Sequence, residues 1–295
     1  MRKIRKAVLP VAGFGTRVLP ATKSIPKEML PVVDRPALQY VVDEAREAGI
    51  EHIVFVTGRN KGAIEDYFDR AYELEATLHL KDKTALLQEL EQKLPAPGST
   101  SFVRQQSPQG LGHAVWCARD VIGDEPFAVL LPDVLVKAKK GCLAQMVQAY
   151  EKTGGNVIAV DPVPNDQTDK YGIIAPINQD GNIYEMSGMV EKPAPAKSPS
   201  NLAITGRYIL QPEIFKFLEE QEPGAGNEIQ LTDAMAKLMK VSQFFALAFD
   251  GKPYDCGSKL GYFKAVCAYA VDHEDIGTEA RALISGMCKL PEYGG

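Results

Sequence analysis

Residues 6–33 read KAVLPVAGFGTRVLPATKSIPKEMLPVV, and this stretch decides how the rest of the chain is organised. It opens with an apolar, β-branched run at residues 7–11, which has the length of a buried parallel strand. The run breaks at AGFGTR, residues 12–17, where glycine lets the backbone approach a ligand closely and leaves amide N–H groups free. The pattern therefore predicts a strand that ends in an anion-binding loop.

The segment after this loop is predicted to be stiff and to return towards it. Pro20, Pro26 and Pro31 exclude a regular helix, so we expect a loop that carries Lys27 back to the glycines. Together with Arg17, this arrangement suits a polyphosphate better than a neutral ligand. The GxxxxGK of a P-loop and the third glycine of a dinucleotide fingerprint are both missing, so neither an ATPase nor a dehydrogenase is favoured.

Composition bounds the class of protein. The chain has 295 residues, of which 45% are hydrophobic and 24% charged, and its net charge is −5. These values are typical of one large globular domain with appendages. The negative balance argues against binding of polymeric nucleic acid or of a membrane surface, although a local basic pocket remains compatible with it.

Cysteine usage indicates a reducing compartment. The number is odd, and the spacing shows neither a C-x-x-C pair nor a metal-ligand pattern, so we expect free thiols in the cytoplasm. We also expect no signal peptide and no membrane span, because each apolar run is too short. The five cysteines are Cys117, Cys142, Cys256, Cys267 and Cys288.

The first half of the chain reads as α/β. A helix is predicted over 36–48, with Pro36 in its first turn, and a buried strand over 52–57; with the first strand they make a right-handed βαβ unit of a parallel sheet. Residues 61–94 carry two helical patterns. Further strands are predicted at 101–106 and 127–131, and the second of these ends at a carboxylate that should face the ligand crevice.

The second half is richer in short strands and turns. A hairpin is predicted by the Asn, Asp and Gly residues at 178–182. The remaining predicted elements are strands at 157–163, 172–177, 183–190, 201–210 and 244–249, and helices at 213–220, 228–240 and in the tail from 258.

The opening stretch resembles the signature of the sugar-1-phosphate nucleotidylyltransferases, G-x-G-T-R followed by P-K-x-[ML]-[LV]-P. Its longer form, AGFGTRVLPATKSIPKEMLPVVDRP, is similar to the bacterial UTP–glucose-1-phosphate uridylyltransferase branch of that family. The resemblance implies a Rossmann-like α/β fold, with a mixed, mostly parallel sheet flanked by helices and a smaller β-rich part that binds sugar.

The resemblance also implies one nucleotidyltransferase domain over residues 1–295. Within it, residues 6–150 are expected to bind mainly nucleotide and 151–257 mainly sugar. Residues 61–95 correspond to a helical insertion, and 258–295 to a C-terminal helical tail.

By the same resemblance, the nucleotide is bound by the glycine-rich loop and by a base-reading pair. Gln105 offers an amide that complements the N3–H and carbonyl edge of uracil or thymine. The complete expected nucleotide-binding set is Ala12, Gly13, Gly15, Thr16, Arg17, Lys27, Gln105 and Gly110.

Metal, sugar and catalytic residues follow from the same source. Asp133 and Asp255 match the family's Mg²⁺ ligands; from the residues alone, Asp255 is equally well explained as a helix cap. Arg17, Lys27 and Asp133 are expected to be catalytic. The expected sugar-phosphate residues are Tyr171, Gly172, Glu191, Lys192, Thr205 and Gly206.

The implied reaction transfers the uridylyl group of UTP to glucose 1-phosphate and gives UDP-glucose and pyrophosphate. We expect in-line attack by the sugar phosphate, assisted by Mg²⁺ and without a covalent intermediate. A thymidylyltransferase using dTTP is the alternative within the class, and a non-catalytic regulatory homologue is the alternative outside it. The resemblance also implies a homotetramer or homodimer.

Overall fold

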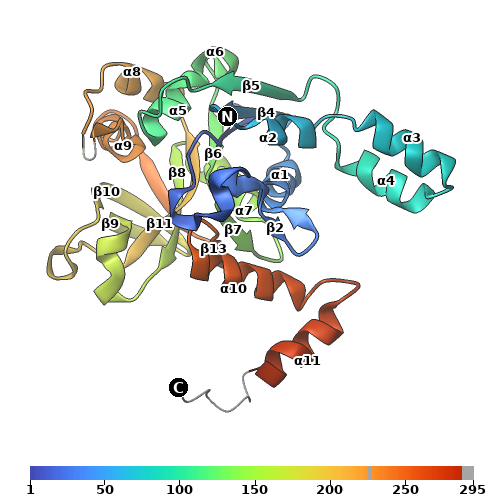
Figure 1. Cartoon of the computed structure of the whole chain (residues 1–295). Helices are drawn as coiled ribbons and strands as arrows, with labels where there is room; N and C mark the ends of the chain where they lie inside the picture. Colours follow the sequence, from blue (N-terminus) through green and yellow to red (C-terminus); the bar gives the residue numbers. More distant parts are fainter. Residues whose placement is uncertain (225–226, 288–295) are drawn as a thin grey trace.

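The structure, a computed structural model, describes residues 1–224 and 227–287. Its centre is a nine-stranded sheet with the order β5-β4-β1-β6-β11-β8-β12-β10-β9 (Figure 1). The strands are β1 (Lys6–Pro10), β4 (His52–Thr57), β5 (Thr100–Arg104), β6 (Phe127–Leu130), β8 (Asn156–Pro162), β9 (Gly172–Asp180), β10 (Ile183–Glu191), β11 (Leu202–Leu210) and β12 (Phe244–Ala248).

The sheet changes direction at β11, and the prediction of a mostly parallel sheet is wrong. The first four strands of this sheet along the chain, β1, β4, β5 and β6, pair in parallel. By contrast, β11 runs antiparallel to both β6 and β8, and the β9–β10 hairpin adds a further antiparallel pair. The result is a mixed sheet that is largely antiparallel beyond β6. An apolar run indicates that a strand is buried but not its direction, which explains the error.

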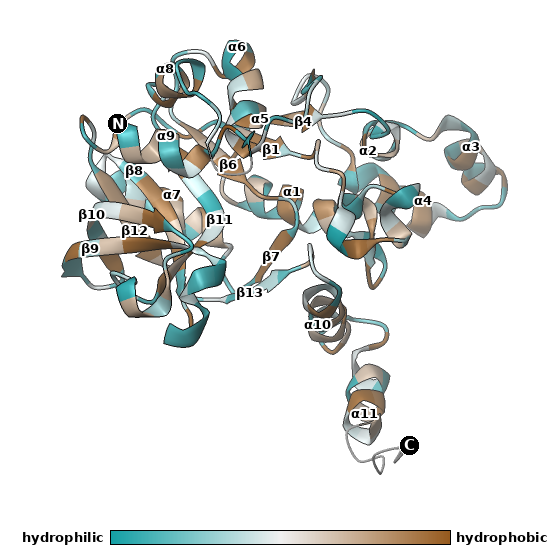
Figure 2. Cartoon of the chain, turned by 60° about the vertical axis from the view of Figure 1, so that its left-hand side comes forward, coloured by the Kyte–Doolittle hydropathy of each residue, from teal (hydrophilic) through white to brown (hydrophobic). Residues whose placement is uncertain are grey.

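Helices cover both faces of the sheet, as predicted. Strand residues alternate between two apolar clusters: Leu9 packs with α1 and α7 on one face, and Val8 packs with α5, α8 and α9 on the other. Figure 2 shows the hydrophobic strands between these layers. The helices are α1 (Ala37–Glu47), α2 (Gly62–Tyr67), α3 (Tyr72–Leu80), α4 (Thr84–Lys93), α5 (Leu111–Cys117), α6 (Arg119–Ile122), α7 (Cys142–Thr153), α8 (Ile214–Glu219), α9 (Leu231–Leu238), α10 (Lys259–Ala270) and α11 (Gly277–Met287).

Two helical segments extend from this body. Residues 61–94 form α2, α3 and α4, one helix more than the sequence pattern indicates, and α3 and α4 project sideways (Figure 1). Helices α10 and α11 form the tail, and Cys288 lies outside the described residues. The other four cysteines are free thiols. Among the described residues, no helix combines the length and apolar character needed to span a bilayer.

A two-stranded sheet that the sequence analysis does not identify lies beside the carboxyl end of β6. It pairs β7 (Val134–Lys137) with β13 (Lys252–Asp255) in antiparallel register, so that Asp255 lies opposite Val134. A second small sheet pairs β2 (Pro31–Val32) with β3 (Arg35–Pro36). The β7–β13 pair brings β13, the last strand among the described residues, next to Asp133.

Candidate active site

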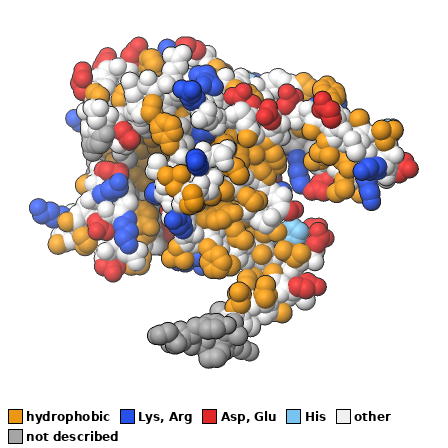
Figure 3. Space-filling model, in the orientation of Figure 1, with side chains coloured by type: hydrophobic (Ala, Val, Ile, Leu, Met, Phe, Trp, Pro, Cys, Tyr) orange, Lys and Arg blue, Asp and Glu red, His pale blue; other side chains and the backbone are white. Residues whose placement is uncertain are grey.

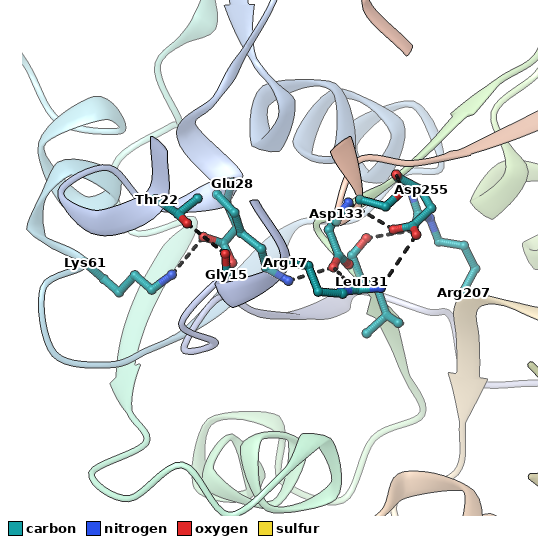
Figure 4. A network of polar contacts seen from close by, with 12 residues as sticks. Gly15, Arg17, Thr22, Glu28, Lys61, Leu131, Asp133, Arg207 and Asp255 are labelled. Atoms are coloured by element: carbon teal, nitrogen blue, oxygen red, sulfur yellow. Dashed lines mark hydrogen bonds and ion pairs between the residues drawn. The ribbon is translucent and has the colours of Figure 1, made fainter. Parts of the chain in front are cut away.

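The glycine-rich loop leaves β1 at the carboxyl edge of the parallel strands and turns sharply at Gly15. Gly15 has a φ of 67°, in the left-handed region that favours glycine. A Cβ atom at Gly15 would lie 3.1 Å from Cβ of Lys27, and the hydroxyl of Thr22 donates a hydrogen bond of 2.7 Å to the Gly15 carbonyl. The proline-containing segment therefore packs against the loop, and Lys27 returns to it as predicted. Figure 4 shows the Thr22 hydroxyl beside Gly15.

Lys27 and Arg17 both reach Asp133. The Lys27 ammonium lies 2.6 Å from Oδ2 of Asp133, and a nitrogen of the Arg17 guanidinium lies 3.6 Å from the same oxygen. Burial acts to raise the pKa of Asp133, but the charge and hydrogen bond of Lys27, aided by Arg17, bring that pKa below its usual value. The aspartate is therefore held ionised at the mouth of the loop.

Asp255 joins this group through the β7–β13 pair. The amide of Cys256 donates a hydrogen bond of 2.7 Å to the Asp133 carbonyl, and the Arg17 guanidinium lies 3.7 Å from Oδ2 of Asp255. A Cβ atom at Gly257 would lie 2.7 Å from Oδ2 of Asp133 and 2.9 Å from Oδ1 of Asp255. A nitrogen of Arg17 would lie 2.6 Å from the same position, so both carboxylates and this guanidinium face one point that a side chain at position 257 would crowd.

This donor set fits Mg²⁺. Two carboxylates supply the oxygen ligands that Mg²⁺ prefers, and the ion usually completes its shell with water and substrate phosphate oxygens. Within residues 1–224 and 227–287, no cluster of three or more His, Cys, Asp or Glu side chains forms a closed metal cage. An open site of this kind leaves ligand positions for a triphosphate.

Gln105 follows β5 and lies next to the end of β4. Its backbone N–H donates to the Thr57 carbonyl at the end of β4, and Gly58 packs against Ala12 of the glycine-rich loop. Gly110, with a φ of 98°, closes the loop that follows: a Cβ atom there would lie 2.9 Å from the Ile229 carbonyl. The end of β4 thus links Gln105 to the glycine-rich loop, whereas Gly110 packs against residues 228–229.

The expected sugar-phosphate residues lie on or beside three strands, β9, β10 and β11. Glu191 pairs with Gly172 across the β9–β10 hairpin, and the Lys192 amide donates to the Tyr171 carbonyl. The Lys192 ammonium lies 3.8 Å from Glu191, and the Lys192 side chain is 62% exposed.

Thr205 and Gly206 connect this region to the aspartates. They lie at a bulge in β11, where Gly206 takes a φ of 69°. The Gly206 carbonyl accepts a hydrogen bond from the amide of Leu131, two residues before Asp133. The two strands that carry the expected sugar and metal residues are therefore linked directly at the site.

A buried ion pair, which the sequence does not predict, supports β11 and the segment around Asp133. Arg207 is fully buried and binds Glu44 of α1 through three hydrogen bonds of 2.9–3.3 Å. It also donates to the carbonyls of Leu131, Gly206 and Val134, on either side of Asp133 (Figure 4). The signal in the sequence is an arginine inside an apolar strand, because a buried charge needs a partner.

A second buried pair supports the turn that carries Lys27. The Lys61 ammonium lies 2.8 Å from Oε2 of Glu28, and both side chains are almost completely buried. Burial raises the pKa of Glu28 although the charges of Lys61 and Lys27 oppose the rise. This pair ties the segment after the glycine-rich loop to the end of β4.

Comparisons with known proteins agree with this geometry. A family model described as nucleotidyl transferase matches residues 6–272. A UTP–glucose-1-phosphate uridylyltransferase of Bacillus subtilis is 50% identical over 292 residues, which are 99% of this chain and 100% of that protein.

Two solved structures are also similar to the chain. A UTP-bound UGPase from Acinetobacter baumannii is 49% identical with a TM-score of 0.90, over 98% of this chain and 100% of the other. A UDP-glucose pyrophosphorylase complexed with UDP-glucose is 44% identical with a TM-score of 0.84, over 92% and 100% of the two chains.

Proposed function

The chain belongs to the nucleotidyl transferase family, and we propose that its crevice joins UTP and glucose 1-phosphate by in-line attack at the α-phosphorus of UTP. The activity is that of a UTP–glucose-1-phosphate uridylyltransferase, which forms UDP-glucose from these substrates. The observation that carries the mechanism is the convergence of Arg17, Lys27, Asp133 and Asp255 at the mouth of the glycine-rich loop.

The nucleotide lies, in this proposal, along the carboxyl edge of the parallel strands. The backbone from Ala12 to Thr16 surrounds the phosphates, while Arg17 and Lys27 balance their charge. Gln105 and Gly110 hold the base. Arg17 and Lys27 must exchange part of their contact with Asp133 for contact with phosphate, because the same cations serve both partners.

The sugar phosphate approaches from the β9–β10 hairpin and β11. Lys192 binds its phosphate, and Glu191 accepts hydrogen bonds from sugar hydroxyls. Tyr171, Gly172, Thr205 and Gly206 complete the pocket. This division, with residues 6–150 for the nucleotide and 151–257 for the sugar, follows the change of strand direction at β11.

The phosphate of glucose 1-phosphate needs no general base, because it is already largely dianionic at neutral pH. One of its oxygens forms a bond to the α-phosphorus, and the bond from that phosphorus to the leaving pyrophosphate breaks. Mg²⁺ held by Asp133 and Asp255 supplies, when bound, positive charge that reduces the repulsion between the two anions. Arg17, Lys27 and Lys192 orient the phosphates for attack, so no protein nucleophile is required.

Two further parts of the proposal concern the whole protein. We infer a homodimer or homotetramer, supported by exposed apolar side chains on the C-terminal helices, where Leu260, Phe263 and Leu283 are each more than 60% exposed. Figure 3 shows hydrophobic side chains gathered over this part of the surface. A location in the cytoplasm also stays a prediction.

The test measures pyrophosphate release with glucose 1-phosphate, Mg²⁺ and UTP or dTTP. UTP should be the better substrate, and EDTA should abolish turnover. Asp133→Asn should lower kcat/KM by about 10³-fold, because it removes a carboxylate that, in this proposal, holds Mg²⁺ and the Lys27 ammonium beside the reacting phosphates. Asp180→Asn, in the exposed hairpin turn, is the matched control and should keep full activity.

Two outcomes contradict parts of the proposal. An Asp133→Asn protein with the turnover of the control would remove Asp133 from the site. A folded protein that binds UTP but releases no pyrophosphate would be the regulatory homologue instead.

A further inference from the structure

Both amide hydrogens of Gln105 are already bound within the protein. Its Nε2 atom lies 3.0 Å from the Gly110 carbonyl and 3.0 Å from Nδ1 of His113. The side chain is 7% exposed, so it has little freedom to turn. An amide nitrogen carries two hydrogens, and these two contacts use both.

The remaining polar atom of Gln105 is therefore its oxygen. Within the described part of the chain, Oε1 accepts no hydrogen bond. It is not fully buried, so solvent reaches it. The Gln105 side chain can therefore offer a ligand only its acceptor atom, Oε1, and not its N–H donors. Rotating the side-chain amide of Gln105 by 180° would place Oε1 against the Gly110 carbonyl oxygen, so the Gly110 carbonyl disfavours that orientation.

The role of His113 depends on which of its nitrogens carries the proton. Nδ1 accepts from Gln105 only if it is unprotonated, so the imidazole is neutral with its hydrogen on Nε2. Burial, and then the charge of Arg119, lower the pKa of His113 and favour this neutral form. Stacking of the imidazole on the Trp116 indole, with ring centroids 5.8 Å apart, fixes its plane.

We propose that His113 is a specificity-positioning residue, which locks the Gln105 amide so that only Oε1 faces the base and accepts the N3–H of uracil. The inference rests on the proposed function, in which Gln105 reads the base of UTP. Cytosine has an acceptor at N3. When CTP binds, Oε1 of Gln105 would therefore face a second acceptor, and no hydrogen bond could form between them. A site that leaves buried polar groups unpaired rejects the wrong ligand strongly.

The test replaces His113 with side chains of defined hydrogen-bonding character. Asp is acceptor-only, Leu neither donates nor accepts, and Lys is donor-only. The quantity compared is the ratio of kcat/KM for UTP to kcat/KM for CTP, because a change in charge or packing alters both substrates alike. We expect His113→Asp to keep the wild-type ratio, His113→Leu to lower it about tenfold, and His113→Lys to lower it further.

Two controls separate positioning from loss of structure. Cys117→Ala removes the thiol that lies 3.9 Å from Nδ1 of His113, one turn along α5, and should leave the ratio unchanged. The ratio for UTP to dTTP should stay constant in every His113 variant, since both bases carry N3–H. Thermal unfolding reports whether each variant is folded, and His113→Asp remains informative if His113→Leu does not fold.

The outcomes distinguish this inference from the proposed function. Equal UTP-to-CTP ratios in all folded His113 variants, together with a lower ratio in Gln105→Leu, would overturn only the role of His113. A ratio that Gln105→Leu leaves unchanged would overturn base reading by Gln105 and this inference with it. Absence of turnover with UTP in the wild-type protein would contradict the proposed function itself.

Discussion

Two lysines represent the two proposed substrate regions of the molecule, and their surroundings differ. Lys27, in the nucleotide region, has a side chain that is 16% exposed and an ammonium 2.6 Å from Asp133. Lys192, in the sugar region, is 62% exposed and its nearest carboxylate, Glu191, is 3.8 Å away. The nucleotide region is thus assembled before any ligand arrives, whereas the sugar region keeps its charge in solvent.

This difference fits the order of strands at the site. The nucleotide region uses loops at one edge of a parallel sheet, where neighbouring strands end together and their loops contact one another. The sugar region uses an antiparallel hairpin, whose side chains near the strand ends have solvent on one side. Preassembly of the first region lowers the entropy that binding has to overcome there.

The largest expected effect is on the contact between the two regions. Arg207 of β11 binds Glu44 of α1 and the carbonyls of Leu131 and Val134, which flank Asp133, so it joins the regions in the core. Arg207→Met should lower the free energy of unfolding by about 3–5 kcal/mol, because it leaves the Glu44 carboxylate buried without its partner. Urea unfolding measures this, with Arg59→Met at an exposed position as the control.

A double variant sharpens this prediction. Glu44→Met combined with Arg207→Met leaves no unpaired charge, so its loss of stability should be smaller than the sum of the two single losses. Simple additivity would mean that Glu44 and Arg207 stabilise the core independently, and the two regions would then not be joined by this pair.

The nucleotide region is easier to predict from the sequence than the contact between Arg207 and Glu44. The strands at residues 52–57 and 127–131 are confirmed, because apolar runs with glycine and proline boundaries are local signals. Helix α7 is missed although Leu143, Met146 and Tyr150 follow a helical spacing and Gly154 ends it. This spacing and the glycine stop are sufficient to predict a helix over α7 from the sequence.

Other features depend on pairing between distant segments and leave no local trace. β13 reads KPYD and is only partly buried, so neither its length nor its composition indicates a strand. Its partner β7 lies more than 100 residues earlier, and only this pairing sets Asp255 next to Asp133. The contact between Arg17 and both aspartates could not be predicted from the sequence for the same reason.

The next effect compares the two lysines directly. Lys27→Gln should lower kcat by about 10²–10³-fold, since it removes a charge that is fixed beside the reacting phosphates. Lys192→Gln should raise KM for glucose 1-phosphate by about 10-fold or more and leave KM for UTP unchanged, because it removes one charge-assisted hydrogen bond. Lys197→Gln, exposed in the same loop as Lys192, is the control.

Steady-state kinetics with each substrate varied in turn decides between these two effects. If Lys192→Gln lowered kcat as much as Lys27→Gln and left both KM values unchanged, the sugar region would also act in the transition state rather than mainly in binding. The comparison between a preassembled region and an open one would then fail.

The smallest effect is expected at the opposite edge of the parallel strands, where they begin, away from the proposed substrate regions. There Glu51 lies 2.8 Å from the Lys3 ammonium and 2.7 Å from the Arg5 guanidinium, and its side chain is 46% exposed. Hydrogen bonds from Lys3 and Arg5 lower the pKa of Glu51 to about 2. Because the pKa is lower in the folded state, the pair stabilises the protein above the ordinary value of 4.5, and this contribution is lost as the pH falls from 4.5 towards 2.

Glu51→Gln should therefore lower the urea midpoint slightly at pH 7, far less than Arg207→Met does, because solvent screens an exposed ion pair. The difference from wild type should shrink in 1 M salt and again as the pH is lowered through this window. A loss as large as that of Arg207→Met, or one that salt does not change, would show that the strand beginnings are held as firmly as the buried contact between the two substrate regions. Rigidity would then be general to the sheet, and the preassembly of the nucleotide region would need no specific contacts to explain it.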